Sequence, residues 1–470
     1  MERTLIVETI KKTGEIVHVC GWVNSLREHG RVVFLDLRDW TGLVQVVFPA
    51  ESLDYEKAKR LTTESTVGIL GLVQERPEKT ENPNLATGKI EVLAENLEVF
   101  SKAQPLPFDV KSDGREISEE KRLQYRYLDL RRERLKNNFI LRHQIINFLR
   151  AFLTQEGFVE IETPILTKST PEGARDYIVP SRLQKGKFYA LPQSPQQYKQ
   201  LLQVAGMERY FQVARCLRDE DPRADRQPEF TQLDMELSFV EREDVMALNE
   251  RLLIETVKKV TPQKKIQEVP FPRISFQEAM SKYKTDRPDL RRDKNDPDLL
   301  AFCWVIDFPF FEKNKEGAWT FTHNPFSAPQ PEHLEWLMNK ERIGEIITTQ
   351  YDIVLNGFEI GGGSIRNHKA EALKKVFEIL GRPEEEIKTN FGHMLEAFSY
   401  GCPPHGGIAW GLDRLVALLL KEESIREVIA FPKTGDGRDL MMDVPSEVSS
   451  EQLKELGIKI VGKEDEKQKR

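Results

Sequence analysis

The chain has 470 residues, of which 39% are hydrophobic, and its formal net charge is −7. This length predicts two or three domains, and the acidic balance argues against non-specific coating of nucleic acid. No apolar run approaches the roughly 18 residues that span a membrane, and the N-terminus is too charged for a secretory signal. The four cysteines form no CxxC pair, which excludes a zinc knuckle by spacing and favours a cytoplasmic protein.

The first hundred residues contain short segments that alternate in hydrophobicity and are separated by Gly, Asn and Asp clusters. Five strands are predicted, at 16–23, 32–38, 43–48, 67–74 and 90–100. A short helix, 55–61, lies between the third and the fourth strand. This order is typical of an OB-type barrel, a fold that binds single-stranded nucleic acid, and we assign residues 1–102 to it.

A hinge and then a long helix follow the predicted barrel. Residues 103–136 are charged and interrupted by Pro105 and Pro107, which favours a linker between domains. Its Arg131 and Arg132 are predicted to lie on a solvated helix face, and contact with a nucleic-acid backbone is the alternative. Apolar residues recur at helical spacing over 138–155, and a strand closed by proline is predicted at 158–164.

A highly charged segment in the middle of the chain lies between two predicted strands. Residues 210–217 and 230–239 alternate in hydrophobicity, whereas 218–228 is charged and contains two prolines. The pattern predicts an antiparallel hairpin with a long loop. The arginines of this loop suit phosphate, because a planar guanidinium binds an anion through two hydrogen bonds. A solvated hairpin tip is the alternative for the loop taken alone.

Two acidic residues flank a predicted turn later in the chain. Asp352 and Glu359 lie on either side of Gly357, a spacing acceptable for oxygen ligands of a Mg²⁺ that is held mainly by phosphates. The glycines at 361–363 are not followed by GK[ST], so they form no Walker loop, and we expect them to let a strand approach the substrate closely. Upstream, the charged segment 283–298 leads directly into a strand predicted at 302–308.

Six longer motifs occur in one order along the chain. They are TPEGARDY at 170–177, QSPQQYKQ at 193–200, LRDED at 217–221, RADRQPEFTQ at 223–232, GFEIGGGSIR at 357–366 and GIAWGLDRL at 407–415. Together they resemble the bacterial-type aspartyl-tRNA synthetases, a branch of the class II aminoacyl-tRNA synthetases, and the resemblance covers nearly the whole chain. It implies an α+β fold, with an OB-fold barrel that reads the anticodon and a class II catalytic domain at 137–445. In that catalytic domain, helices are expected to flank an antiparallel sheet.

The resemblance also has departures. The domain that bacterial-type members insert between motifs 2 and 3 is expected to be absent near 289–298, and residues 446–470 are expected to be a C-terminal extension. Asn324 stands where many members have a second histidine after His323. Any electrostatic role of that histidine is therefore in doubt here.

The resemblance implies the ATP-dependent joining of L-aspartate to tRNA in two steps, without a covalent enzyme nucleophile. The α-carboxylate of aspartate attacks the α-phosphorus of ATP, and a ribose hydroxyl of the tRNA then attacks the aspartyl-adenylate. The matching aspartate-binding positions are Glu172, Gln196 and Asp234 for the ammonium, Lys199 and Arg366 for the side-chain carboxylate, and His323 in the pocket wall. A cationic pair in a dry pocket favours this carboxylate over the neutral amide of asparagine.

The resemblance assigns a second group of residues to ATP. Arg218 would grip the α-phosphate and stabilise its charge during attack, and Arg414 would contact the γ-phosphate. Phe230 would stack on adenine. The remaining matching positions are Glu220 and Gln227 for ATP, and Asp352 and Glu359 for Mg²⁺, with Glu359 also counted as catalytic beside Arg218 and Arg414.

The barrel positions that match tRNA contacts lie between the first and second predicted strands and in the second, third and fifth strands. Phe34 would stack on a base, Gln45 and Glu91 would bind base edges, and Arg27 would hold backbone phosphate. A barrel-core aromatic is the alternative for Phe34. His29 matches a position where histidine accompanies enzymes that accept both tRNA(Asp) and tRNA(Asn), and an ordinary hairpin-tip residue is the alternative. The enzyme is thus expected to charge tRNA(Asp), with tRNA(Asn) as a further substrate or strict choice of tRNA(Asp) as the alternative.

Three further expectations concern partners and rival functions. The helix and strand at 138–164 resemble motif 1, which forms a two-fold interface, so a homodimer is expected, with a helix buried inside a monomer as the alternative. An asparaginyl ligase or an amidating paralogue is a rival function. Lys199 argues against the former, and the intact barrel against the latter. A non-catalytic nucleic-acid-binding protein would be expected to have lost Arg218, Glu359 or Arg414.

Overall fold

A computed structural model describes residues 2–170, 173–220 and 226–461 of the protein. The chain divides into two compact units, Met1–Asp109 and Val110–Arg470. Within the described ranges, no helix combines the length and the apolar character that crossing a membrane requires.

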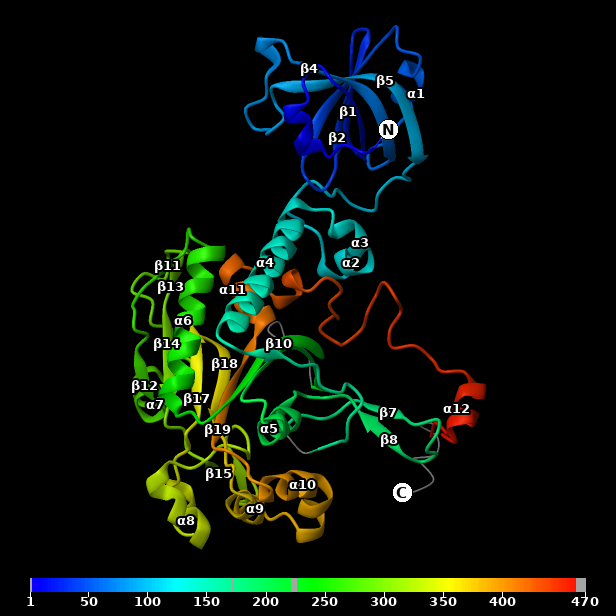
Figure 1. Ribbon diagram of the computed structural model, residues 1–470. Coiled ribbons are helices and arrows are strands. Elements are labelled where there is room, and N and C mark those ends of the chain that lie inside the picture. The colour runs from blue at the N-terminus through cyan, green and yellow to red at the C-terminus, as the bar shows by residue number, and fades with distance from the viewer. Residues whose placement is uncertain (1, 171–172, 221–225, 462–470) are drawn as a thin grey trace. The chain divides into compact units, whose positions relative to one another are not determined.

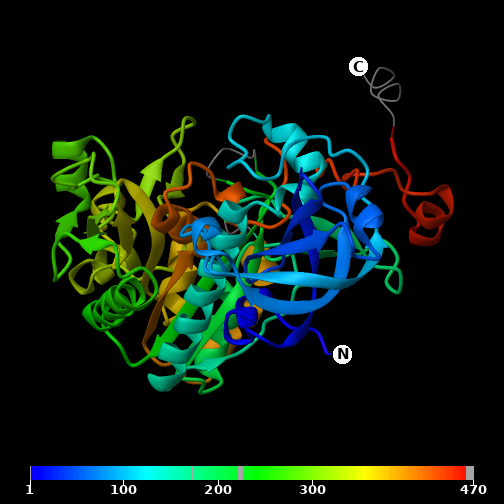
Figure 2. The ribbon, with the colours of Figure 1, turned by 90° about the horizontal axis from the view of Figure 1, so that it is seen from above.

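The first unit is a closed five-stranded barrel, drawn in blue in Figures 1 and 2. The barrel order is β1-β2-β3-β5-β4, with β3 and β5 parallel. Its elements are η1 (Ile6–Lys11), β1 (Ile16–His29), β2 (Val32–Arg38), β3 (Leu43–Pro49), α1 (Tyr55–Lys59), β4 (Thr66–Glu75), η2 (Glu78–Thr80) and β5 (Ile90–Ser101). The predicted strands and helix are confirmed, and β1 continues six residues beyond its predicted end. Alternate strand residues such as Val33, Leu35 and Leu37 are fully buried, because successive side chains point to opposite faces and one face fills the barrel.

The second unit is built on an eight-stranded mixed sheet with the order β12-β14-β17-β18-β19-β10-β9-β6. Its strands are β6 (Val159–Glu160), β9 (Arg209–Leu217), β10 (Glu229–Ser238), β12 (Arg273–Ser275), β14 (Phe302–Ile306), β17 (Tyr351–Leu355), β18 (Phe358–Ile365) and β19 (His405–Gly411). The six central strands pair antiparallel, as predicted, but the two edge strands β6 and β12 pair parallel to their neighbours. The predicted hairpin is confirmed by β9 and β10, in which Phe230 lies opposite Cys216.

Helices cover the sheet and bury its apolar side chains. The longer ones are α4 (Glu133–Gln155), α5 (Gln196–Val204), α6 (Arg242–Val260), α7 (Phe276–Tyr283), α9 (Ala370–Ile379), α10 (Glu384–Ser399) and α11 (Leu412–Leu420). The main core joins α4, α6 and α11 to the central strands, with Trp304 and Trp410 fully buried. Each of these helices has a polar face toward solvent and an apolar face toward the sheet. The layers form because the apolar faces are buried against each other.

Short elements complete the second unit. They are α2 (Glu119–Gln124), α3 (Arg126–Asp129), β7 (Ile178–Pro180), β8 (Phe188–Ala190), β11 (Lys265–Ile266), β13 (Leu299–Leu300), β15 (Phe311–Lys313), β16 (Trp319–Phe321), η3 (Pro331–His333), α8 (Leu334–Asn339), η4 (Ile343–Glu345), η5 (Ile425–Val428) and α12 (Ser450–Leu456). Two sequence predictions need correction. The helix predicted at 138–155 begins earlier, at Glu133, and the strand predicted at 158–164 pairs with its neighbour only over Val159–Glu160.

The solvated face predicted for Arg132 is wrong. Its side chain is fully buried, and its Nε donates to Asp129 Oδ1 at 2.7 Å. Arg122 and Arg126, from the same segment, are buried against the same carboxylate. The spacing of charges along the predicted helix indicated that the Arg132 side chain faces solvent. Tertiary contacts instead place this part of the linker inside the second unit.

Candidate active site

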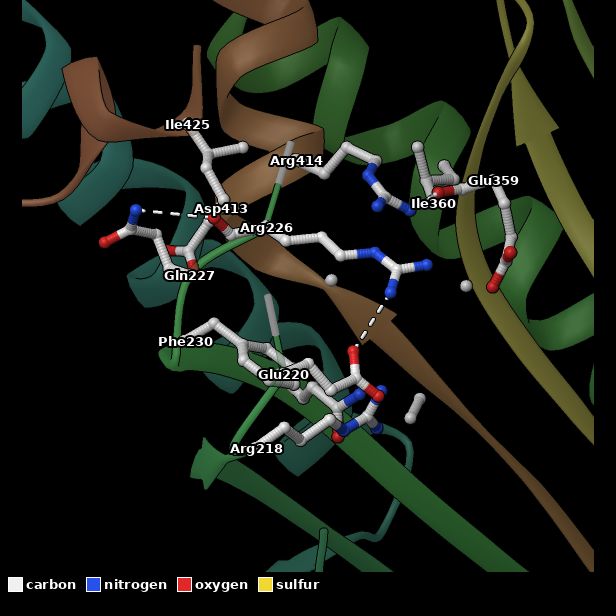
Figure 3. Close-up of a pocket in the computed structure, with 14 residues that line it drawn as sticks. Arg218, Glu220, Arg226, Gln227, Phe230, Glu359, Ile360, Asp413, Arg414 and Ile425 are labelled. Carbon is white, nitrogen blue, oxygen red and sulfur yellow. Dashed lines mark hydrogen bonds and ion pairs between the residues drawn. The ribbon is translucent and has the colours of Figure 1, made fainter. Parts of the chain in front are cut away.

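A cavity opens at the C-terminal end of β9 and the start of β10, beside β18 and the start of α11 (Figure 3). All six residues predicted to bind ATP line it: Arg218, Glu220, Gln227, Phe230, Glu359 and Arg414. Eight further residues line it, and among them Arg226, Gln232, Asp413 and Ile425 were not assigned to ATP from the sequence. Arg226 belongs to the same charged loop and had the same signal as Arg218, whereas Ile425 had no chemical signal at all.

Three arginines and one aromatic ring, that of Phe230, line this cavity. The Arg218 guanidinium lies 5.0 Å from the centroid of the Phe230 ring, a distance at which a cation is attracted to a ring face. Arg226 pairs with Glu220 at 3.0 Å, as the dashed line in Figure 3 shows. Arg414 donates to the backbone carbonyl of Glu359, which ties the first turn of α11 to β18. Such a wall can bind a flat ring and a polyanion together.

The two predicted metal ligands come from the β17–β18 hairpin, which turns at Asn356 and Gly357 with positive φ angles of 52° and 88°. Burial raises the pKa of Glu359, and the neighbouring Asp352 charge raises it further, which indicates two close carboxylates. A divalent cation would relieve that repulsion. Among the described residues no group of three or more His, Cys, Asp or Glu side chains is arranged to hold a metal. Asp352 and Glu359 are two carboxylates that could contribute oxygen ligands to a divalent cation.

His323, predicted to line the amino-acid pocket, lies beside Asp352 with 3.5 Å between Nε2 and Oδ2, and its ring packs against Phe308. Although burial lowers the pKa of His323, the hydrogen bond and charge of Asp352 raise it above its ordinary value. Asp352 also accepts from Gln350 at 2.7 Å. The histidine therefore lies next to the candidate metal ligands.

Lys199 and Arg366 converge on one buried carboxylate, that of Glu236. Lys199 Nζ lies 3.2 Å from Glu236 Oε2, and Arg366 Nε lies 2.8 Å from Glu236 Oε1. Lys199 also donates to Asp234 at 2.6 Å. These four side chains, which we call the aspartate cup, are almost completely buried, and their formal charges cancel.

Glu236 was missed by sequence reasoning. It lies two residues after Asp234 on β10, so both side chains point to the same face, and an acidic pair spaced by two in an apolar strand was the available signal. Burial opposes ionisation of Glu236, but the charges of Arg366 and Lys199 lower its pKa to about 2. Burial raises the pKa of Asp234, and Lys199 partly opposes that shift.

Two buried polar atoms, one in the cup and one near it, have no hydrogen-bond partner among the residues that the structure describes. They are Oδ2 of Asp234 and Nε2 of Gln196, two of the three side chains predicted to contact an ammonium group. Glu172, the third, lies outside the described residues. A buried acceptor without a partner is costly, which marks the Asp234 oxygen as a place for a donor from a ligand.

The three glycines at 361–363 were expected to let β18 approach the substrate, but they let it approach neighbouring protein groups instead. A Cβ on Gly363 would lie 2.1 Å from the carbonyl oxygen of Gly407 on β19, and one on Gly362 would lie 2.6 Å from Asp352 Oδ1. Gly361 also lines the cavity. The glycines thus bring β18 close to β19 and to the metal-ligand candidate, and only Gly361 also lines the ligand space.

In the barrel, the five predicted tRNA contacts share one face. Arg27 lies opposite Phe34 on β1 and β2, and Gln45 lies opposite Glu91 on β3 and β5. Gln45 donates to Glu91 at 2.8 Å, and Arg27 pairs with Asp36 at 3.2 Å. Phe34 is half-buried and outside the barrel core, so the core-aromatic alternative is wrong. His29 is exposed at the end of β1, on the same side as Arg27.

Comparisons with known proteins agree with this geometry. Residues 118–435 match the family described as tRNA synthetases class II (D, K and N), and residues 17–100 match the OB-fold nucleic acid binding domain. The Aspartate--tRNA(Asp/Asn) ligase of Caldanaerobacter subterraneus subsp. tengcongensis is 41% identical, covering 96% of this chain and 97% of its own. The Aspartate--tRNA(Asp/Asn) ligase of Chlorobaculum parvum is 42% identical, covering 96% and 95%.

Solved structures show the same fold at lower identity. Asparaginyl-tRNA synthetase from Pyrococcus horikoshii, complexed with asparaginyl-adenylate, is 24% identical, with a TM-score of 0.74 over 92% of this chain and 98% of that one. Aspartyl tRNA synthetase from Entamoeba histolytica is 22% identical, with a TM-score of 0.71 over 92% and 91%. From its sequence match over 118–435 and its near full-length relatives, the chain belongs to the class II tRNA synthetases of the D, K and N group.

Proposed function

We propose that this protein is an aspartate–tRNA ligase, which activates L-aspartate with ATP and transfers it to the 3′ end of tRNA. The observation that carries the proposal is the aspartate cup, in which Lys199 and Arg366 are buried together beside the ATP cavity residues of β10 and β18. The relatives named Aspartate--tRNA(Asp/Asn) ligase, at about 41% identity over nearly the whole chain, support the same activity.

The charges of the cup suit aspartate better than asparagine. Asp234 has an oxygen without a partner that can accept from the substrate ammonium. Lys199 and Arg366 can both donate to the substrate side chain while Glu236 keeps them in place. A substrate carboxylate can accept hydrogen bonds from both Lys199 and Arg366, whereas the NH₂ group of asparagine would place a donor against these donors.

Activation would then follow from position and charge. Phe230 offers an aromatic face for adenine, and Arg218 beside it would stabilise the α-phosphate as the aspartate carboxylate attacks. Arg414 would hold the γ-phosphate, which leaves together with the β-phosphate as pyrophosphate. Asp352 and Glu359 would hold Mg²⁺, which supplies charge neutralisation on the phosphates when bound.

The barrel face is the proposed anticodon surface. Phe34 is half-buried and available for stacking, and the pairing of Gln45 with Glu91 presents hydrogen-bonding groups beside it. The two substrate choices are tRNA(Asp) alone, or tRNA(Asp) together with tRNA(Asn). The names of the relatives and the exposed His29 favour the second, non-discriminating choice.

Aminoacylation of two purified tRNAs tests the proposal. The full chain is mixed with ATP, Mg²⁺ and radiolabelled aspartate, and charging of tRNA(Asp) and of tRNA(Asn) is followed separately. Charging of both is the expected result, and His29→Leu is expected to reduce charging of tRNA(Asn) selectively. Charging of tRNA(Asp) alone would support the aspartate–tRNA ligase activity but refute the acceptance of tRNA(Asn). Charging with asparagine in preference to aspartate would refute the assignment of the cup.

Three further features belong to the proposal. A homodimer is supported by apolar side chains left exposed on α4 and β6, Ile140 at 40% and Val159 at 54%, and light scattering of the purified protein tests it.

Absence of the inserted domain is supported by an alignment of 577 positions with a relative, which exceeds the 470 residues here. A cytoplasmic site of action follows from the tRNA substrate and is consistent with four free cysteines.

A further inference from the structure

A buried charged cluster lies away from the substrate side chains, where α2, α3 and the start of α4 meet η5. We call Arg122, Arg126, Asp129, Arg132 and Glu427 the hinge cluster. Asp129 is fully buried and accepts hydrogen bonds from three arginines: Arg122 Nε at 3.1 Å, Arg126 Nη1 at 2.6 Å and Arg132 Nε at 2.7 Å. Although burial opposes it, these hydrogen bonds hold the pKa of Asp129 below its ordinary value. The carboxylate therefore fixes the orientation of three guanidinium groups at once.

Arg126 donates its remaining N–H groups to backbone carbonyls of η5 and of the two residues that follow it. Its Nη2 donates to the carbonyl oxygens of Arg426 at 2.9 Å and Ile429 at 3.0 Å, and its Nε donates to that of Ala430 at 2.9 Å. The last carbonyl groups of a helix have no N–H partner within the helix and need donors from elsewhere. One rigid guanidinium thus satisfies three carbonyl groups, which a lysine ammonium cannot match in geometry.

The segment that Arg126 holds is also a wall of the ATP cavity. Ile425, the first residue of η5, lines the cavity. Further along, the backbone of Lys433 exchanges two hydrogen bonds with the side chain of Gln227, at 2.7 and 3.0 Å, and Gln227 lines the cavity as well. Residues 425–433 therefore reach the cavity at two points, through Ile425 directly and through Gln227, which Lys433 holds.

A second contact connects the same wall with α11. Arg142 on α4 donates to Asp413 at 2.5 Å and to the carbonyl of Val428 at 3.3 Å. Asp413 lines the cavity and accepts from the backbone N–H of Thr231 on β10. The wall is thus held from outside by arginines that themselves lie outside the cavity lining.

We propose that Arg126 and Asp129 are positioning residues for ATP, which shape the nucleotide cavity through η5 without touching the nucleotide. The inference rests on the proposed function only in taking ATP as the ligand. Among the hydrogen bonds described, none joins the hinge cluster to the aspartate cup. Disrupting the hinge cluster should therefore weaken ATP binding and leave aspartate binding unchanged. A purely structural role would weaken both substrates alike or neither.

Two variants of the full chain test this. Arg126→Lys keeps the charge and loses the three-carbonyl geometry, and Asp129→Asn removes the carboxylate that orients it. Arg291→Lys is the matched control, since Arg291 makes a similar two-pronged contact, to Asp289 at 3.0 and 2.8 Å, in another part of the second unit. For each protein we would measure the Kd of ATP with Mg²⁺ by calorimetry, the KM values of ATP and aspartate in pyrophosphate exchange, and the melting temperature.

We expect the Kd and KM of ATP to rise roughly tenfold in Arg126→Lys, with the KM of aspartate within about twofold of wild type, because small displacements of a binding wall are costly. Arg291→Lys should change none of these values. An unchanged Kd of ATP in folded Arg126→Lys, or an equal rise in both KM values, would overturn the inference. If Asp129→Asn does not fold, Arg126→Lys decides alone. If the wild type binds ATP without activating aspartate, the proposed function fails while the comparison of Kd values still tests the inference.

Discussion

Replacing Lys199 by methionine tests the aspartate cup most directly. Lys199 is 1% exposed, and its Nζ makes the one hydrogen bond described for the Asp234 side chain, at 2.6 Å. Methionine keeps the length and the apolar stem and removes the charge. Asp234 is then left buried without its cation, and Arg366 alone faces both Glu236 and the substrate carboxylate.

The activity loss can be estimated from the loss of one buried partner. Breaking a buried ion pair on one side costs about 3–5 kcal/mol, which corresponds to a fall of about 10²- to 10⁴-fold in kcat/KM for aspartate. Aspartate-dependent pyrophosphate exchange measures it, and the Kd of ATP should stay near the wild-type value. Lys264→Met is the control, because Lys264 is also buried and paired, to Asp298 at 3.1 Å, but lies outside the cup.

The stability loss has a pH dependence with a definite sign. Burial already raises the pKa of Asp234 above its ordinary 3.8 and Lys199 partly opposes that shift, so removing Lys199 raises the pKa further and the folded variant holds a proton that the unfolded chain has released. The free-energy cost of holding that proton grows with pH by at most about 1.4 kcal/mol per pH unit. The difference in unfolding free energy between wild type and variant should therefore shrink as pH falls. Equal differences at pH 7 and pH 5, or a kcat/KM within about threefold of wild type, would refute this account of the cup.

Other expectations concern the remaining parts of the site. Arg218→Ala should reduce pyrophosphate exchange by at least about 10²-fold, because a donor aimed at developing charge is lost, and near-normal exchange would contradict its role. Phe34→Ala should raise the KM of tRNA roughly tenfold through lost base stacking, while pyrophosphate exchange without tRNA stays unchanged; a change in exchange would argue against a barrel role. Glu236, whose pKa is lowered to about 2, should contribute stability in full above its ordinary value of 4.5 and lose it as pH falls toward 2. The gap in unfolding free energy between wild type and Glu236→Gln should then narrow between pH 6 and pH 4, and a gap that widens would contradict the assignment.

Several parts of the fold could be predicted because their determinants are local. The barrel strands follow from alternation and turn residues, and their predicted bounds differ from the structure by at most one residue except at the end of β1. The ATP residues were assigned for a different reason: the family resemblance supplied their positions, and only the suitability of the loop arginines for phosphate came from the residues themselves. The structure shows that these residues line one cavity. The strand predicted at 158–164 is longer than β6, because an apolar run cannot reveal how far a neighbouring strand pairs with it.

The hinge and the cup show what local patterns could not reveal. Arg132 has the spacing of a solvated helical arginine, yet it is fully buried because Asp129 and the backbone near Ser112 surround it. Glu236 had no motif of its own, and its role becomes visible only where β10, α5 and β18 bring it between Lys199 and Arg366. Burial and partner choice depend on residues far apart in sequence, and that information is absent from any single segment.

The sequence by itself determined the strand and helix order, the kind of charged groups available and the resemblance that implied an aspartate-activating enzyme, because periodicity and motif chemistry are written in neighbouring residues. Only the tertiary structure decided which charges cancel. It paired Lys199 and Arg366 through Glu236 and placed η5 between the hinge arginines and the ATP cavity. The physical reason is that the energy of a buried charge depends on its nearest partners and its distance from water, and both are set by packing between distant segments.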